Sequence, residues 1–304
     1  MKVELGEVLT RAWQIMWKNK VLWAISALPI LVSFLIIPIW LFMAFTGDFD
    51  PEKMFGFFEN EGFVILVIIF YLIVFAVSLV LQIASRSSTT LGIYRAESGI
   101  QPVTFVDLIK DGFSYFLRIL GISLLVFSIY MAFMLVFFAC ITLASIATLG
   151  LASICLQPLF LLVFPLALLL MAFMEQAEAA VVVDGLGVME AAKRGYELVR
   201  ANLLNFALIT VVIYFGMSIL SSFLVFPFMI PMFFFMMPNL ESGMPDFNNI
   251  FRMQAVFMVV LLPIMALVQG VSLTYLKSAM MVAYLRLTRS SGAPQTELQG
   301  VPTP

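Results

Sequence analysis

The sequence predicts an all-α polytopic membrane protein with six transmembrane helices in three repeated hairpins, each preceded by an amphipathic interfacial helix. Three observations support this fold class. The mean hydropathy is +1.09, and only 11% of the residues are charged, whereas soluble domains average about 25%. Long charge-free runs recur along the chain, and similar polar segments precede three of the predicted spans. The chain is therefore expected to lie largely within a bilayer.

The charge-free runs locate the spans. A charge at the bilayer centre costs about 2.5 to 3.5 kcal/mol on insertion scales, and a spanning helix needs about 20 apolar residues. The runs cover residues 21–47, 62–85, 119–174, 201–240 and 253–276. The third run is long enough for two crossings, with a turn expected at 147–158 because Gly150 and Pro158 break helices. This gives six spans.

The fourth run is too long for one span and contains several prolines. Pro227, Pro231 and Pro238 interrupt it, and proline removes a helical hydrogen bond. We therefore expect a span at 202–226 and an interfacial segment at 227–238. Two half-helices that re-enter the membrane from one face are the alternative.

The basic residues predict the orientation. With six spans, 14 of the 16 Lys and Arg residues fall on the side of the two termini, and only Lys53 and Arg252 fall on the other. The positive-inside rule then places both termini in the cytoplasm, as expected for a bacterial inner-membrane protein. Glu4 and Glu7 precede any apolar core, so we expect no cleavable signal peptide.

Three segments of the chain resemble one another. "EVLTRAWQIMWKN" (7–19), "DLIKDGFSYFLRI" (107–119) and "EAAKRGYELVRAN" (190–202) share an acidic residue first, a small residue sixth and an aromatic residue seventh. Each stands before an odd-numbered predicted span, which indicates an internal repeat. We expect one membrane domain at 1–292, with repeats at 1–99, 100–187 and 188–292, and a short polar tail at 293–304.

Helical spacing within these segments separates apolar from charged residues. Such a pattern next to a span predicts a helix in the cytoplasmic interface, and the small residue would allow close approach to a neighbouring helix. The alternative is that the segments are the polar inner ends of long tilted spans. The residues expected to contact lipid at the interface are Arg11, Trp13, Trp17, Lys110, Phe113, Lys193, Arg194 and Tyr196.

The pattern "VVVDGLGVMEAAKRGYELVRAN" (181–202) and the closing "VAYLRLTR" (282–289) resemble the membrane domain associated with bacterial glycerophosphoryl diester phosphodiesterases. They also resemble related stand-alone multi-pass proteins of uncharacterised role. The resemblance covers the membrane part alone. In the two-part proteins of that family, hydrolysis belongs to a separate soluble barrel domain that needs histidine and metal-binding carboxylates. This chain contains no histidine, so the resemblance implies no phosphodiesterase activity here.

Few polar side chains are expected within the spans. No ionisable residue falls inside them as placed above, which argues against a charge-coupled pump. Glu175 and Glu178 lie on one helix face at the inner end of the fourth span. They either form a cation or proton site at the cytoplasmic mouth or pair with Lys or Arg of a neighbouring interfacial helix, the interpretation we favour. Gln82, Gln157 and Gln269 are expected to link helices by hydrogen bonds, with substrate contact as the alternative.

The sequence contains no catalytic constellation. It has no nucleophile–base pair, phosphate-binding loop or metal-ligand spacing, so we expect neither an enzyme nor a bound cofactor or metal. Cys140 and Cys155 flank the turn of one hairpin and either pair or serve as small packing residues.

The predicted function follows from these features. We expect a non-enzymatic scaffold or regulator that contacts lipid or a partner through its cytoplasmic amphipathic helices. The alternative is a transporter or channel for a neutral or lipid-like solute. The expected partners are membrane lipids and an unidentified protein or a second copy of the chain, and not nucleic acid.

Overall fold

The computed structural model describes residues 4–35, 61–100, 104–148, 160–241 and 247–290, and these ranges contain helices and no strand. Several helical stretches are long and apolar enough to cross a membrane, which makes this a multi-pass membrane protein. They are Val64–Glu97, Phe105–Ala147, Val163–Val183, Leu203–Pro227 and Ala255–Thr288. A shorter apolar helix covers Val21–Ile30, and residues 36–47 of the first predicted span lie outside the described residues.

The described residues form a series of helices along the chain. In order they are α1 (Leu5–Lys18), α2 (Val21–Leu31), the 3₁₀ helix η1 (Val32–Leu35), α5 (Glu61–Glu97), α6 (Phe105–Gly112), the 3₁₀ helix η2 (Phe113–Tyr115), α7 (Phe116–Ala147), α9 (Phe160–Val183), α10 (Val188–Ala201), α11 (Leu203–Glu241) and α12 (Phe247–Ser290). The turn expected at 147–158 lies between α7 and α9, and residues 149–159 are outside the described part.

The prolines of α11 were expected to interrupt the helix, and this expectation was wrong, while the interfacial position of 227–238 stays a prediction. The apolar part of α11, Leu203–Pro227, matches the predicted span, but the helix continues to Glu241 and includes 227–238. Membrane helices tolerate proline because local adjustments and neighbouring groups satisfy the freed backbone carbonyls. The chain contains other examples, since Pro165 lies inside α9 and Pro263 inside α12.

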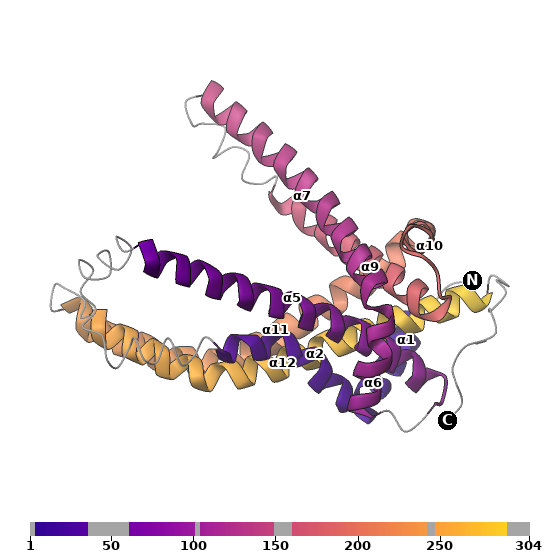
Figure 1. Cartoon of the computed structure of the whole chain (residues 1–304), viewed down its shortest axis with the longest axis horizontal. Coiled ribbons are helices and arrows are strands. Elements are labelled where there is room, and N and C mark those ends of the chain that lie inside the picture. Colours follow the sequence, from indigo (N-terminus) through magenta and orange to yellow (C-terminus); the bar gives the residue numbers. More distant parts are fainter. Residues whose placement is uncertain (1–3, 36–60, 101–103, 149–159, 242–246, 291–304) are drawn as a thin grey trace.

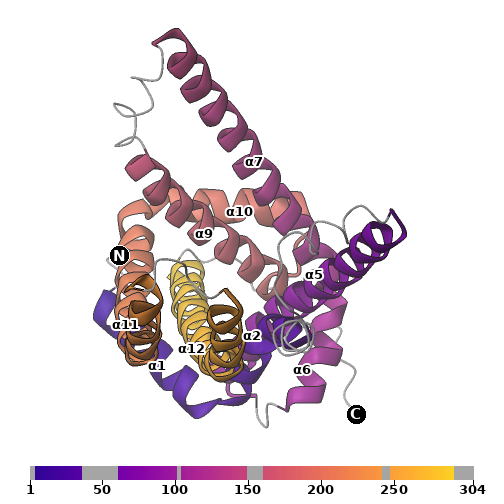
Figure 2. The same ribbon diagram turned by 90° about the vertical axis from the view of Figure 1, so that its left-hand side faces the viewer.

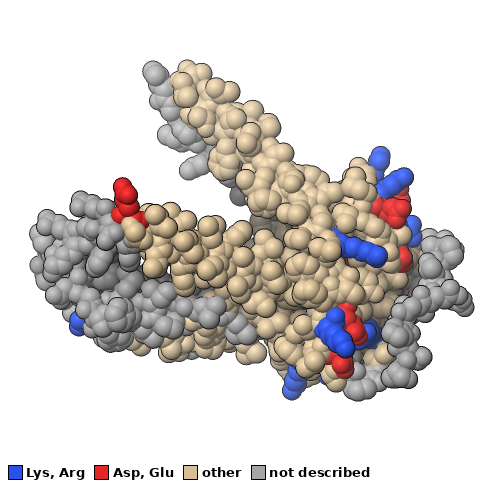
Figure 3. Space-filling model, viewed as in Figure 1, with Lys and Arg blue, Asp and Glu red and all other residues tan. Residues whose placement is uncertain are grey.

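The long helices extend from one end of the molecule in two arms. Figure 1 shows α7 with α9 in one arm and α5, α11 and α12 in the other. The short helices α1, α6 and α10 lie at the end from which both arms extend. Figure 3 shows that most of the Lys, Arg, Asp and Glu side chains visible in this view gather at the same end, whereas the arms are largely uncharged. We call the end formed by α1, α6 and α10 the polar end.

The packing follows an ordered pattern. Helices α5, α9 and α12 contact one another, and each carries one short helix: α6 packs on α5, α10 on α9 and α1 on α12. The remaining long helices fill the gaps, because α2 contacts α12 and α5, α7 contacts α5 and α9, and α11 contacts α9 and α12. Figure 2 shows α2, α12 and α11 side by side. Helices α5, α9 and α12 thus form the centre.

Two short helices approach their long neighbours so closely that only glycine fits. A Cβ atom on Gly195 of α10 would lie 2.9 Å from the backbone nitrogen of Ala177 in α9. A Cβ atom on Gly112 of α6 would lie 2.9 Å from Cα of Ser88 in α5. Ala12, the corresponding residue of α1, is fully buried. The small sixth residue of each polar segment therefore lies at a tightly packed or buried position, as the sequence predicted.

Burial is concentrated near the polar end. The inner parts of α5, α9 and α12 and the apolar sides of α1, α6 and α10 supply most of the buried core. The outer part of α5 exposes large apolar side chains, for example Leu66, Leu72 and Phe75. Exposed apolar surface of this extent on a long helix is typical of contact with lipid.

Candidate functional site

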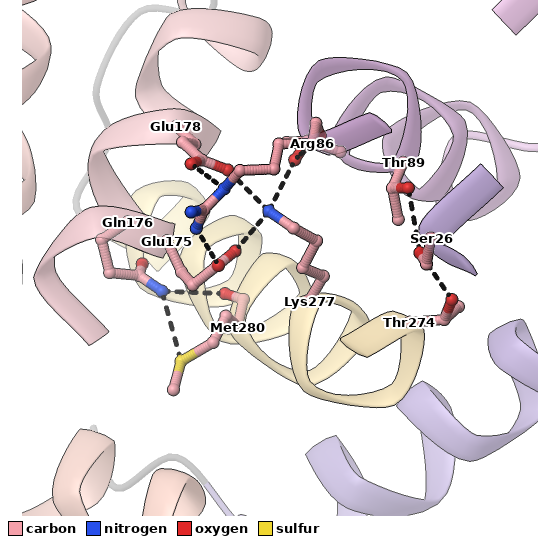
Figure 4. Close-up of polar contacts among 10 residues, drawn as sticks. Ser26, Arg86, Thr89, Glu175, Gln176, Glu178, Thr274, Lys277 and Met280 are labelled. Atoms are coloured by element: carbon pink, nitrogen blue, oxygen red, sulfur yellow. Dashed lines mark hydrogen bonds and ion pairs between the residues drawn. The ribbon is translucent and has the colours of Figure 1, made fainter. Parts of the chain in front are cut away.

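Four charged side chains meet in the centre of the protein, where α5, α9 and α12 touch. Arg86 comes from α5, Glu175 and Glu178 from α9, and Lys277 from α12 (Figure 4). Lys277 Nζ lies 2.8 Å from Glu175 Oε2 and 2.6 Å from Glu178 Oε2. The Arg86 guanidinium lies 2.9 Å from Glu175 Oε1 through Nη2 and 2.8 Å from Glu178 Oε1 through Nε. We call these residues the charge tetrad.

The tetrad is electrically balanced and mostly buried. Each carboxylate contacts both cations, so two positive and two negative charges alternate. The side chain of Glu178 is fully buried, those of Glu175 and Lys277 are 4% and 5% exposed, and that of Arg86 is 20% exposed. Removing one member of a buried ion pair leaves an uncompensated charge, which costs about 3 to 5 kcal/mol. The tetrad therefore fixes the positions of α5, α9 and α12 relative to one another where the four charges meet.

A regular spacing in the sequence places these residues together. Arg86, Glu175 and Lys277 each directly follow a charge-free run. Nine residues after each of them stands a second charged residue: Arg95 after Arg86, Asp184 after Glu175 and Arg286 after Lys277. Arg95 and Arg286 lie on the same helix as the first residue, and Asp184 comes directly after the end of α9.

These second charged residues join the long helices to the short helices and to one another near the polar end. Arg95 pairs with Asp111 of α6 at 2.6 Å, and Arg286 pairs with Glu7 of α1 at 2.5 Å. Asp184 instead accepts a hydrogen bond from Tyr284 of α12. Arg86, Glu175 and Lys277 thus occupy corresponding positions on the three central helices.

Hydroxyl groups extend this polar centre toward α2. Ser26 Oγ of α2 lies 3.1 Å from Thr89 Oγ1 of α5, and Thr274 of α12 donates to Ser26 Oγ at 3.0 Å. Lys277 Nζ also donates to Thr90 Oγ1 of α5 at 3.4 Å. Figure 4 shows Ser26, Thr89 and Thr274 beside the tetrad. The hydrogen bonds join three helices from distant parts of the sequence.

A cavity of about 740 Å³ adjoins the tetrad between α5, α7 and α9. Its walls are mainly apolar and include Phe75 of α5, Phe127 of α7 and Met171 of α9. The polar side chains that line it are Ser78, Gln82 and Arg86 of α5 and Ser123 and Tyr130 of α7. Of the four tetrad residues, only Arg86 lines the cavity. The arrangement can accept a molecule with an apolar body and a polar group near Arg86.

The residues expected at the interface lie on the short helices at the polar end. Trp13 and Trp17 are exposed and stack with ring centroids 5.7 Å apart, and Arg11 pairs with Glu97 of α5 at 2.9 Å. Lys110, Phe113, Lys193 and Tyr196 are exposed and Arg194 is half-buried. They belong to three separate helices, α1, α6 with the adjoining η2, and α10.

The expected environment of Glu175 and Glu178 requires a correction. Both pair with Arg86 and Lys277 of the long helices, and neither of these cations belongs to an interfacial helix. The spans were also expected to hold no ionisable residue, but α5 continues to Glu97 and α12 to Ser290. Opposite charges on neighbouring helices offset one another, so the charge that ends an apolar run need not end the buried helix.

The glutamines and the cysteine discussed above that the structure describes lie outside the tetrad. Gln82 is exposed and lines the cavity, and Gln269 is exposed on α12. Cys140 is exposed on α7. Gln157 and Cys155 lie outside the described residues, so the prediction for Gln157 and the pairing of the cysteines stay predictions.

Comparison with known proteins adds no family. No family model, curated protein or solved structure matches the chain. The resemblance to the membrane domain of glycerophosphoryl diester phosphodiesterases therefore stays a prediction, and the tetrad and the cavity are the features of the molecule that bear on its function.

Proposed function

We propose that the chain is a multi-pass protein of the bacterial inner membrane, with both termini cytoplasmic, that binds a lipid-like molecule in the cavity between α5, α7 and α9 and transfers it. The observation that carries this proposal is the cavity of about 740 Å³ with apolar walls and a polar end at Arg86. Small-molecule sites usually measure about 300 to 1,000 Å³ and are lined mainly by apolar side chains. The cavity is within that range.

The position of the cavity supports entry from the bilayer. It is lined by helices of both arms, since α7 and α9 form one arm and α5 belongs to the other. In the space-filling view the two arms separate toward their outer ends (Figure 3). Leu124 and Phe127 of α7 line the cavity and are themselves exposed. A molecule dissolved in the lipid can thus reach the cavity sideways, without crossing the polar end.

The packing pattern supports six spans in three repeated hairpins. Each short helix packs on the long helix before it, and α1 packs on the last one. The glycines at 112 and 195 make equivalent close approaches to their neighbours. Many transporters contain internal repeats with a binding site between repeat units. The cavity fits this plan, because α5 belongs to the first predicted repeat and α7 and α9 to the second.

The balanced tetrad makes charge-coupled pumping a less suitable role. Both carboxylates contact both cations, so a proton or metal ion would have to displace an existing partner. We therefore propose a solute whose transfer does not require a charged residue to bind and release a proton or a metal ion in each cycle. A lipid-like molecule meets this requirement.

Filling the cavity tests the proposal. Ala167 lines the cavity on α9, whereas Ala76 is exposed on α5 and does not line it. We expect Ala167→Trp to abolish lipid co-purification, measured by native mass spectrometry, and to slow lipid transfer between the leaflets of reconstituted vesicles. Ala76→Trp is the matched control and should change neither. Equal results for the two variants, or no transfer by the parent protein above empty vesicles, would refute the proposal.

A scaffold role at the polar end is the second candidate. It is favoured by the exposed aromatic and basic side chains on the short helices, such as Trp17, Lys110 and Lys193, which suit anionic lipid head groups or a protein partner. Lys110→Glu with Lys193→Glu should weaken binding to vesicles that contain anionic lipid or capture of a partner. Unchanged binding would count against this role and leave the cavity proposal intact.

A further inference from the structure

The cavity wall formed by α5 carries a line of polar side chains. Ser78, Gln82 and Arg86 are spaced four residues apart and all line the cavity, because residues at this spacing share one face of a helix. At about 1.5 Å per residue the line extends about 12 Å along α5. Ser123 and Tyr130 of α7 also line the cavity. The polar groups thus lead from Arg86 into the apolar part of the cavity.

Arg86 retains hydrogen-bond donors for a ligand. Its Nε and Nη2 atoms contact Glu178 and Glu175. A guanidinium has five N–H donors, so the two on Nη1 take no part in these ion pairs. The side chain is also the most exposed of the tetrad and the only one of the four that lines the cavity. A ligand in the cavity therefore meets Arg86 and none of the other three tetrad side chains.

This geometry selects a class of ligand. A planar guanidinium recognises carboxylate and phosphate groups through paired hydrogen bonds. The apolar walls, which include Phe75, Leu79 and Phe127, suit a hydrocarbon chain. An anion alone would leave these walls without a partner, and a neutral hydrocarbon would leave the guanidinium unused.

We propose that the cavity binds an anionic amphiphile, with its phosphate or carboxylate group on Arg86 and its hydrocarbon chain along the apolar wall of α5 and α7. This inference rests on the proposed function and names the chemical class of the solute. Lys277 holds both carboxylates from the other side. Arg86 can therefore share its donors with a ligand while Glu175 and Glu178 keep a cationic partner.

Two charge-balanced double variants separate ligand binding from stability. Arg86→Gln with Glu178→Gln removes one cation and one anion and leaves the pair between Lys277 and Glu175. Glu175→Gln with Lys277→Gln also removes one of each and leaves the pair between Arg86 and Glu178. Both preserve the zero net charge of the tetrad, and only the first removes the guanidinium from the cavity.

The full chain in nonionic detergent is titrated with three probes and followed by native mass spectrometry. The probes are hexadecyl phosphate, hexadecanol and inorganic phosphate. We expect the parent to bind hexadecyl phosphate more tightly than either other probe. Arg86→Gln with Glu178→Gln should weaken the binding of hexadecyl phosphate by about tenfold or more, equivalent to about 1.4 kcal/mol. The affinity for hexadecanol should stay unchanged. Glu175→Gln with Lys277→Gln should weaken binding of hexadecyl phosphate less than the first double variant does, because the guanidinium stays in the cavity.

Gln82→Glu keeps the test decisive if the first double variant fails to fold. Gln82 is exposed and lies outside the tetrad. A carboxylate there, one turn from Arg86, should repel hexadecyl phosphate and not hexadecanol. Equal effects on the two probes would overturn the inference.

The remaining outcomes identify which idea has failed. Equal loss in the two double variants would show that Arg86 acts only through stability, and tight binding of inorganic phosphate alone would show a site for free anions. Either result would overturn the amphiphile inference. Equal affinity of the parent for hexadecyl phosphate and hexadecanol would also overturn it, but would leave the proposed function standing if Ala167→Trp blocks both. If Ala167→Trp blocks neither, the proposed function itself fails.

Discussion

Lys277→Met should destabilise the protein far more than the loss of an exposed ion pair. Lys277 Nζ contacts Glu175 at 2.8 Å and Glu178 at 2.6 Å, and its side chain is only 5% exposed. At an effective dielectric constant of about 20, each contact of this length carries a gross attraction of about 6 kcal/mol. Desolvation offsets much of it. Breaking a buried pair costs about 3 to 5 kcal/mol net, and we expect the upper part of that range because one cation serves two carboxylates.

Unfolding of the purified protein in mixed micelles, titrated with dodecyl sulfate and followed by far-ultraviolet circular dichroism, measures this cost. Arg286→Met is the matched control, because its pair with Glu7 is exposed and should contribute about 0 to 1 kcal/mol. Adding Glu178→Gln to Lys277→Met restores the charge balance and should recover most of the loss. The reasoning is refuted if Lys277→Met costs no more than Arg286→Met, or if the double variant is as unstable as the single one.

Two further predictions use the same titration. Gly195→Ala should destabilise the protein by about 1 to 3 kcal/mol, because the new Cβ would lie 2.9 Å from the backbone nitrogen of Ala177. Gly216→Ala, which meets no atom within 4 Å, should be neutral or stabilising by up to about 1 kcal/mol, and similar losses in both variants would contradict the packing argument. Tyr284→Phe should cost about 1.5 to 3 kcal/mol, because it removes the hydrogen bond from a buried hydroxyl to the carboxylate of Asp184. An unchanged midpoint would show that this bond contributes nothing to stability.

Hydropathy was sufficient to predict the all-helical class and the positions of the long apolar helices. Charge-free runs coincide with helices because the cost of a charge in lipid is local and can be read along the chain. The close approach of the short helices was also predictable, since the small residue before each aromatic is visible in the sequence. At residues 112 and 195 it is a glycine that packs against a neighbouring backbone.

The tetrad was not predicted, and the reason is physical. Arg86, Glu175 and Lys277 each end an apolar run, so each was interpreted as the point where a span reaches water. A hydropathy count cannot distinguish a charge that faces water from one that faces an opposite charge on another helix. The shared position of the three residues, nine before a second charge, was the available signal. The continuation of α11 beyond Pro227 was missed similarly, because neighbouring groups can compensate for a proline.

The tetrad also sets an order for the assembly of the chain. Arg86 is synthesised first, Glu175 and Glu178 follow, and Lys277 comes last. Until α12 arrives, the partial site holds one positive and two negative charges, and Glu175 and Glu178 share Arg86 as their cation in the tetrad. Burial of this unbalanced charge is unfavourable, so we expect α5 and α9 to close fully around the carboxylates only after α12 has docked. Of the described helices, α12 is made last, and it is then the one that completes the electrostatic balance.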